Sequence, residues 1–229
     1  MKGIIHQVKN HKDSESQAKV CYDSFKKFGH DVVIKDGITP NTIKEYDVYD
    51  VLKNSRLESF LKNDKNERKH LVKKSCVLNN IQFCKKVIEK DEPMMFLEHD
   101  ALCVSPFDNI DFDEFVYLAI EYWNKPPSGL ALRQFVGYNP LYKIGVSDFP
   151  NDWPLTYYKE TIHKGSKLTP GTMCYGLTPK GAKKIIHNAE KHGLEQSDYI
   201  INSSVVRLQY VYPSLAKQQS TNLNLSHKL

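Results

Sequence analysis

The sequence has no long hydrophobic run. Its apolar stretches fall far short of the ~18 consecutive residues that a membrane-spanning helix needs. The opening residues, MKGIIHQVKNHK, also lack the apolar core of a signal peptide. We therefore expect a cytoplasmic protein with no membrane span.

Cysteine is scarce, and its spacing argues against two kinds of site. The five cysteines are scattered along the chain, each lies among apolar neighbours, and no C-x-x-C pair occurs. Structural zinc sites and disulfide frameworks depend on closely spaced or paired cysteines. The pattern instead predicts buried free thiols in a reducing compartment.

Internal repeats and low-complexity tracts are absent too. A chain of 229 residues that is 40% hydrophobic and 26% charged has the size and composition of one globular domain. Its net charge of +5 is compatible with nucleotide phosphates, nucleic acid or anionic headgroups as partners. The same excess is common in proteins that bind none of these, so charge alone does not identify a partner.

Hydrophobic periodicity predicts an α/β fold with a parallel sheet. The predicted strands are short apolar runs bounded by turn residues, at 3–8, 31–35, 94–97, 130–136 and 171–177. The predicted helices have apolar residues at helical spacing and cover 16–28, 70–89, a segment capped by Asp111 or Asp113, and a segment from Pro179 to the stop at Gly193. The stretch VVRLQYVYP fits either a short helix or a strand, and 137–170 is rich in loops.

Three ionisable residues, Glu98, His99 and Asp100, follow the predicted strand at 94–97. Open α/β sheets place their ligand crevice at the carboxyl ends of strands, so this position favours a site. Two buried carboxylates without a partner would cost several kcal/mol, and we therefore expect a cation nearby. Oxygen ligands suit Mn²⁺ or Mg²⁺. A helix N-terminus or a solvated turn that favours acids is the alternative.

Three sequence blocks occur in a fixed order. They are SESQAKVCYDSFKKFG with DVVIKDGITP, then KKSCVLNNIQFCKKVIEKDEPMMFLEHDAL, then GTMCYGLTPKGAKKII with the later SDYI and YVYPSLAKQQ. As an ordered set they resemble the family 25 glycosyltransferases, which include lipopolysaccharide and lipooligosaccharide sugar transferases and collagen galactosyltransferases. The resemblance covers a little under half of the chain and does not extend to 108–170. The family's acidic triplet is usually Glu-Asp-Asp, whereas the middle residue here is His99.

The resemblance implies one GT-A-like, Rossmann-type domain over 1–215, with a mainly parallel central sheet flanked by helices. It implies sugar transfer from a nucleotide-sugar donor to the hydroxyl of a saccharide acceptor, with inversion and with Mn²⁺ or Mg²⁺ as cofactor. Asp100 would be the first metal ligand, and Glu98 a second ligand or a ribose contact. His227 would close the metal shell from a polar tail over 216–229 that acts as a lid, unless this tail is simply unstructured.

Asp198 matches the family's later aspartate, which implies a general base that takes the proton of the acceptor hydroxyl. The alternative is an N-cap for an element that begins at Tyr199. His99 is grouped with the cofactor-binding residues, but strand alternation predicts that it points to the opposite side from its neighbours and is not the principal ligand.

Further nucleotide contacts are expected at the end of the first strand and on the helix over 70–89. The candidates are Ile5, His6, Gln7 and Lys74. Each also fits an ordinary role in a turn or on a solvated helix face. These contacts are therefore a hypothesis that depends on where the strand ends.

Two other functions compete with saccharide transfer. The helix that begins at Pro179 is basic, with Lys180, Lys183, Lys184 and Lys191, which fits a solvated face or a polyanionic acceptor. The acceptor would then be a hydroxymethylated base in DNA. The third hypothesis is a catalytically inactive nucleotide-sugar-binding module, in which His99 has replaced a required acid.

Overall fold

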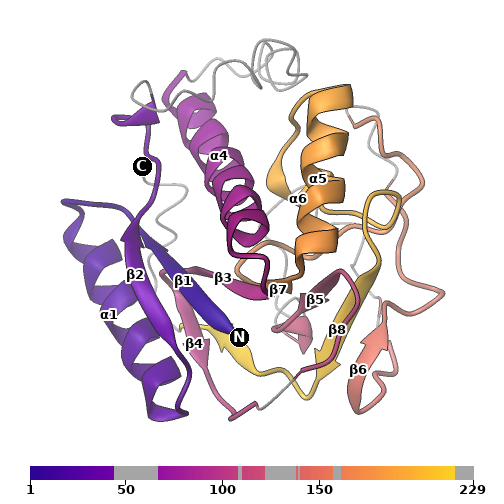
Figure 1. Cartoon of the computed structure of the whole chain (residues 1–229), viewed down its shortest axis with the longest axis horizontal. Helices are drawn as coiled ribbons and strands as arrows, with labels where there is room; N and C mark the ends of the chain where they lie inside the picture. Colours follow the sequence, from indigo (N-terminus) through magenta and orange to yellow (C-terminus); the bar gives the residue numbers. More distant parts are fainter. Residues whose placement is uncertain (44–66, 108–109, 122–137, 139, 157–160, 220–229) are drawn as a thin grey trace.

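The computed structural model describes residues 1–43, 67–107, 110–121, 138, 140–156 and 161–219 (Figure 1). Seven strands form the main sheet in the order β2-β1-β3-β7-β5-β8-β6, and β4 and β9 form a second, two-stranded sheet. The strands are β1 (Lys2–Gln7), β2 (Val32–Asp36), β3 (Met94–Glu98), β4 (Ala101–Cys103), β5 (Phe115–Tyr117), β6 (Gly145–Asp148), β7 (Cys174–Leu177), β8 (Leu208–Tyr212) and β9 (Ala216–Gln218). The helices are α1 (Lys12–Lys27), α4 (Glu67–Lys90), α5 (Pro179–His192) and α6 (Ser197–Ile200).

The main sheet is mixed, with most strands in one direction. β1 pairs in parallel with β2 and β3, and β5 pairs in parallel with β8. β7 is antiparallel to β3 and β5, and β6 is antiparallel to β8. α4 and α5 lie side by side on one face of the sheet, whereas α1 lies on the other (Figure 1). The prediction of an α/β fold with a large central sheet flanked by helices is confirmed.

Aromatic packing joins α4 to the centre of the sheet. Phe96 of β3 and Tyr175 of β7 stack with ring centroids 5.1 Å apart. Phe83 of α4 meets both rings edge-on, at 5.4 and 5.7 Å. Both faces of these strands are covered, which explains why the run over 94–97 is continuously apolar instead of alternating.

The local chemistry of α5 agrees with the sequence in detail. Thr178 is the N-cap, and its Oγ1 accepts a hydrogen bond from the amide of Gly181 at 3.2 Å. Pro179 is the first helical residue, and Gly193 ends the helix with a φ of +83°. The predicted boundaries of this helix are confirmed.

Other predicted elements need correction. The segment after Asp113 forms strand β5 and not a helix, because Phe115–Tyr117 pairs between β7 and β8 and is fully buried. VVRLQYVYP contains strand β8, the second of the two alternatives. α1 begins at Lys12, earlier than predicted, with His11 as its N-cap. The strand expected at 130–136 lies outside the described residues.

Strand β9 brings the C-terminal part of the described chain back into the fold. Ala216–Gln218 pairs antiparallel with Ala101–Cys103, directly after the acidic triplet. The first residues of the predicted tail therefore belong to a sheet, whereas 220–229 lie outside the described residues. In the part of the chain that the structure describes, none of the helices has the length and apolar character to cross a membrane.

Candidate functional site

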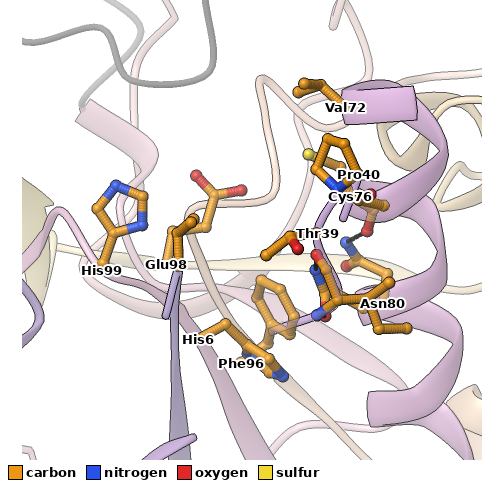
Figure 2. A pocket seen from close by; sticks show the side chains of 13 residues that line it. His6, Thr39, Pro40, Val72, Cys76, Asn80, Phe96, Glu98 and His99 are labelled. Carbon is orange, nitrogen blue, oxygen red and sulfur yellow. Dashed lines mark hydrogen bonds between the residues drawn. The ribbon is translucent and has the colours of Figure 1, made fainter. Parts of the chain in front are cut away.

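A pocket opens at the carboxyl ends of β1 and β3, beside α4 (Figure 2). One wall is the loop after β2, which Asn79 of α4 holds in place. Asn79 Oδ1 accepts a hydrogen bond from the backbone N–H of Ile38 at 2.7 Å, and Asn79 Nδ2 donates one to the carbonyl of Ile38 at 3.0 Å. These two bonds fix the width of the pocket, since they tie the loop to the helix.

The walls of the pocket are mainly apolar, and the buried Nδ1 of His6 has no hydrogen-bond partner among the described residues. Asn80 uses its amide within the framework, accepting from the hydroxyl of Tyr175 at 2.6 Å and donating to Ser197 Oγ at 3.2 Å. His6 stacks on Phe96 with ring centroids 4.5 Å apart, and burial lowers the pKa of its imidazole to about 4. The interior therefore presents apolar and aromatic surface, which suits a flat ring better than a fully hydroxylated sugar.

Glu98 and His99 form the polar end of the pocket. Thr172 Oγ1 donates to Glu98 Oε1 at 3.4 Å. Burial, together with the nearby charges of Asp100 and Asp198, raises the pKa of Glu98 to about 8. Burial also raises the pKa of Asp198, to about 6. These perturbed carboxyls share one weakly solvated region, as in many functional sites.

The two carboxylate oxygens of Asp100 differ in their hydrogen bonding. Its Oδ2 accepts a hydrogen bond from Gln218 Nε2 at 2.7 Å. Its Oδ1 is buried and forms no hydrogen bond with the described residues. An acceptor-only atom in that state fits a cation, and carboxylate oxygen is the donor type that Mn²⁺ and Mg²⁺ prefer.

The described side chains supply an incomplete ligand set. Across the described ranges, no three His, Cys, Asp or Glu side chains converge as a metal-binding group. Among the Lys and Arg residues whose side chains the structure describes, none forms an ion pair with Glu98, Asp100 or Asp198. Asp100 Oδ1 and Glu98 are thus the protein atoms that fit an ion here, and the remaining ligands of a full shell would come from elsewhere.

The structure brings several predicted residues together. His6, Glu98 and His99 all line the pocket, and Asp198 is close enough for its charge to raise the pKa of Glu98. His99 was expected to point to the opposite side. It lines the same pocket as Glu98, because β3 ends at Glu98 and the next residues form a turn, where strand alternation no longer applies.

Other predicted contacts lie away from the pocket. Ile5 is fully buried in the hydrophobic core, and Gln7 Nε2 donates to Asp36 Oδ1 at 2.9 Å. Lys74 lies on α4 but does not line the pocket. His227 lies outside the described residues.

The capping alternative for Asp198 is wrong. The N-cap of α6 is Gln196, and Asp198 lies within the first turn of the helix. The role of Asp198 as a base stays a prediction.

Sequence reasoning missed three contributors to the site. Asn79 and Asn80 are adjacent amides within a helix, a pattern that could have indicated buried polar anchoring. Cys76 lines the pocket as an exposed thiol, whereas the other four cysteines are buried as expected. Although the residue reaches solvent, the atoms packed around its thiol, together with the charges of Glu98 and Asp198, raise the pKa of Cys76 to about 12.

Comparison with known proteins adds no family assignment. No protein-family model matches the sequence, and no curated protein is significantly similar to it. Functional inference therefore depends on the geometry and electrostatics of the pocket and its acidic end.

Proposed function

We propose that the chain is a metal-dependent glycosyltransferase of the family 25 type, which moves a sugar from a nucleotide-sugar to the hydroxyl of a saccharide, with inversion, in the cytoplasm. One observation carries this proposal. Glu98, Asp100 and Asp198 gather beside an apolar pocket at the carboxyl ends of β1 and β3, and no Lys or Arg side chain that the structure describes forms an ion pair with them.

The proposal includes a GT-A-like, Rossmann-type fold. The parallel β2-β1-β3 half of the sheet has its pocket at the carboxyl ends of the strands, where α/β folds bind nucleotides. The apolar walls around Phe96 would take the base and ribose, and Glu98 at the polar end lies where a ribose hydroxyl or an ion would be held.

The three acidic residues divide into two roles in this mechanism. Asp100 Oδ1 and Glu98 would hold Mn²⁺ or Mg²⁺, which supplies positive charge to the diphosphate leaving group. Asp198 would accept the proton of the acceptor hydroxyl. Its pKa of about 6 leaves the carboxylate ionised at neutral pH yet more basic than an ordinary aspartate.

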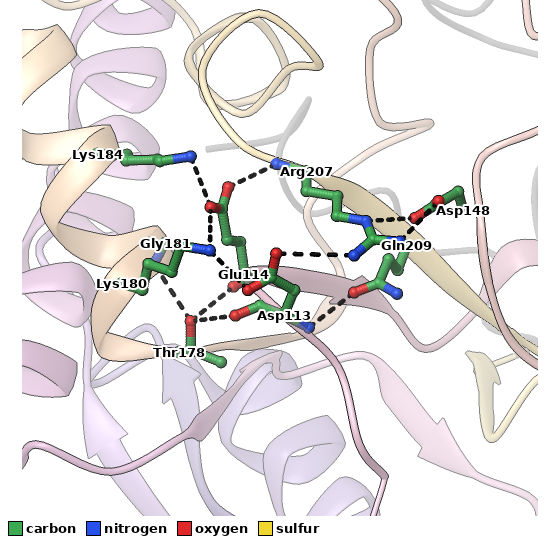
Figure 3. A network of polar contacts seen from close by, with 9 residues as sticks. All are labelled: Asp113, Glu114, Asp148, Thr178, Lys180, Gly181, Lys184, Arg207 and Gln209. Atoms are coloured by element: carbon green, nitrogen blue, oxygen red, sulfur yellow. Dashed lines mark hydrogen bonds and ion pairs between the residues drawn. The ribbon is translucent and has the colours of Figure 1, made fainter.

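The basic helix α5 gives weaker support to DNA as acceptor than the sequence suggested. Lys180 Nζ lies 2.8 Å from Asp113 Oδ1, and Lys184 Nζ lies 2.5 Å from Glu114 Oε1 (Figure 3). Two of its four predicted basic residues are therefore neutralised within the molecule. A saccharide acceptor is favoured on this ground.

The test is a thermal-shift screen with nucleoside diphosphates and their sugar conjugates, each with Mn²⁺ or with EDTA. A ligand present at 100 times its Kd stabilises the folded state by about 2.7 kcal/mol, which raises the Tm of a chain this size by about 5–10 °C. We expect a shift that needs both nucleotide and Mn²⁺ and that Asp100→Asn abolishes. Asp111→Asn, an exposed acid elsewhere, is the matched control.

Turnover separates the enzyme from the inactive binding module. Wild-type protein should hydrolyse the stabilising nucleotide-sugar slowly in the absence of acceptor, and Asp198→Asn should lower this rate while keeping the thermal shift. A shift without any hydrolysis or transfer would favour the binding module. The absence of a shift with every nucleotide, with and without metal, would refute the proposed function.

A further inference from the structure

Gln218 is the described side chain that contacts the carboxylate of Asp100. It reaches the acidic turn because β9 pairs with β4, with Gln218 opposite Ala101. Its Nε2 donates to Asp100 Oδ2 at 2.7 Å, a charge-assisted bond to an acceptor-only group. Gln218, far from Asp100 in the sequence, thus contacts the residue that is the first candidate for a metal ligand.

The bond decides which oxygen of Asp100 is available. With Oδ2 held by the amide, the carboxylate cannot rotate freely about its last bond, and Oδ1 keeps one direction. That oxygen is the buried one for which the described chain provides no donor. A carboxylate in this state is set to bind an ion through a single oxygen.

Gln219 braces the backbone of the same turn. Its amide N–H donates to the carbonyl of Asp100 at 2.8 Å. Its side-chain Nε2 lies 3.2 Å from the carbonyls of His99 and Ala101, and 3.0 Å from that of Gln17. The backbone before and after Asp100 is therefore fixed by the residue next to Gln218, so the orientation of Asp100 depends on the docking of β9.

We propose that Gln218 is a positioning residue that orients Asp100 for metal binding through Oδ1, and that metal binding and the docking of β9 are coupled. The inference rests on the proposed function, since it takes Asp100 as a metal ligand. Loss of an outer-shell partner commonly weakens metal affinity 10- to 100-fold. Coupling is reciprocal, so the ion should also stabilise β9.

The test is Mn²⁺ binding followed by the EPR signal of free Mn²⁺, on the full chain alone and with UDP or GDP. Gln218→Met keeps the length of the side chain and removes its donor. We expect at least about 10-fold weaker Mn²⁺ binding by this variant. Lys217→Met, at the neighbouring exposed position of β9, should stay within about threefold of wild type.

A second measurement needs no variant. Hydrogen exchange of a peptide over 214–219 should slow several-fold when wild-type protein binds Mn²⁺, because the ion fixes Asp100 and thereby the amide bonds of β9. Peptides from α5, on the opposite face of the sheet from α1, serve as the internal control and should not change. This measurement stands even where Gln218→Met does not fold.

The outcomes separate the two proposals. Wild-type protein that binds no Mn²⁺ under any of these conditions refutes the proposed function, and this inference with it. Wild-type binding with equal binding by a folded Gln218→Met, or with unchanged exchange over 214–219, refutes the role of Gln218 alone. Weaker binding by Gln218→Met, together with Mn²⁺-dependent protection of β9, supports it.

Discussion

The acidic side chains around Glu114 and those around Glu98 differ in whether nearby cationic groups of the protein neutralise their charge. Around Glu114, each carboxylate has a partner from α5 or from Arg207, the residue before β8 (Figure 3). Glu114 is 1% exposed, and Lys184 and Lys180 lie 2.5 and 3.1 Å from its Oε1, while the backbone amide of Arg207 donates to Oε2 at 2.8 Å. The guanidinium of Arg207 in turn binds Asp148 through two hydrogen bonds.

The pKa values of the two groups move in opposite directions. Burial by itself would raise the pKa of Glu114, but the hydrogen bonds from Lys184, Arg207 and Lys180 outweigh it, and its pKa lies below the usual range. The pKa of Glu98 is raised to about 8, mainly by burial and also by the charges of Asp100 and Asp198. The lysines near Glu114 stabilise its charged form. Glu98 has the hydroxyl of Thr172 as a hydrogen-bond partner but no cationic partner among the described side chains, which is the basis for proposing a metal ion beside it.

The largest effect is expected from breaking the balanced group. Glu114→Ala removes the acceptor of two lysines and leaves the amide of Arg207 without its partner, so unfolding in urea should show a loss of about 2–3 kcal/mol. Lys183→Ala, exposed on the same helix, should change stability by less than about 0.5 kcal/mol. If the two substitutions changed stability equally, the hydrogen bonds and ion pairs of Glu114 would not stabilise the fold as argued.

At Glu98 we expect the ionised carboxylate to destabilise the folded state, the opposite of its effect at Glu114. Its folded-state pKa of about 8 lies above the ordinary 4.5, so between these values the folded state binds more protons than the unfolded state, and stability falls as pH rises. The lowered pKa of His6 opposes this trend only below about pH 6.5. In EDTA, the Tm of wild type should therefore decline from pH 6.5 to 8.

Glu98→Gln removes the loss of stability that ionisation of Glu98 causes. The variant should be more stable than wild type by about 2 kcal/mol at pH 8 in EDTA, less than the full pKa difference implies because the side chain is partly solvated. Its Tm should also decline less between pH 6.5 and 8, whereas Glu190→Gln, an exposed acid on α5, should follow wild type. A destabilised Glu98→Gln would mean that Glu98 is compensated by the protein itself.

The smallest effect concerns Cys76, which reports on the charges of the acidic end. Iodoacetamide should modify Cys76 before the other cysteines, because its thiol is exposed and theirs are buried. The reaction should still be slow, because the pKa of Cys76 is raised to about 12. Above pH 8, where Glu98 is ionised, Glu98→Gln removes one of the charges that raise this pKa and should speed the alkylation a few-fold, as followed by mass spectrometry. Cys76→Ser is the control for labelling elsewhere, and an unchanged rate in Glu98→Gln would separate Cys76 from the acidic group.

Local chemistry made part of the fold predictable. The boundaries of α5 follow from Thr178, Pro179 and Gly193, whose effects act over a single turn of chain. β5 was missed because its three apolar residues fit either periodicity, and only pairing with β7 and β8 decides between them. The pairing of β4 with β9 joins segments more than a hundred residues apart, beyond the reach of any periodicity.

The site was predictable where it depends on the end of a strand. Glu98 and His6 lie in the pocket because carboxyl ends of parallel strands meet at one edge. Ile5 and Gln7 do not line the pocket, because Ile5 packs in the core and Gln7 donates a hydrogen bond to Asp36, contacts that the sequence does not reveal. The contact of Gln218 with Asp100 appears only in three dimensions, because one hydrogen bond between distant residues leaves no pattern in the sequence.

The place of β7 in the sheet has a consequence for the growing chain on the ribosome. Cys174–Leu177 is synthesised late, yet it lies between β3 and β5. Until it emerges, the nascent β2-β1-β3 unit has an unpaired edge along Met94–Leu97, one of the most apolar stretches of the molecule. Such edges promote association between unfinished chains, so this protein is most vulnerable to aggregation during the synthesis of the roughly eighty residues that separate the two strands.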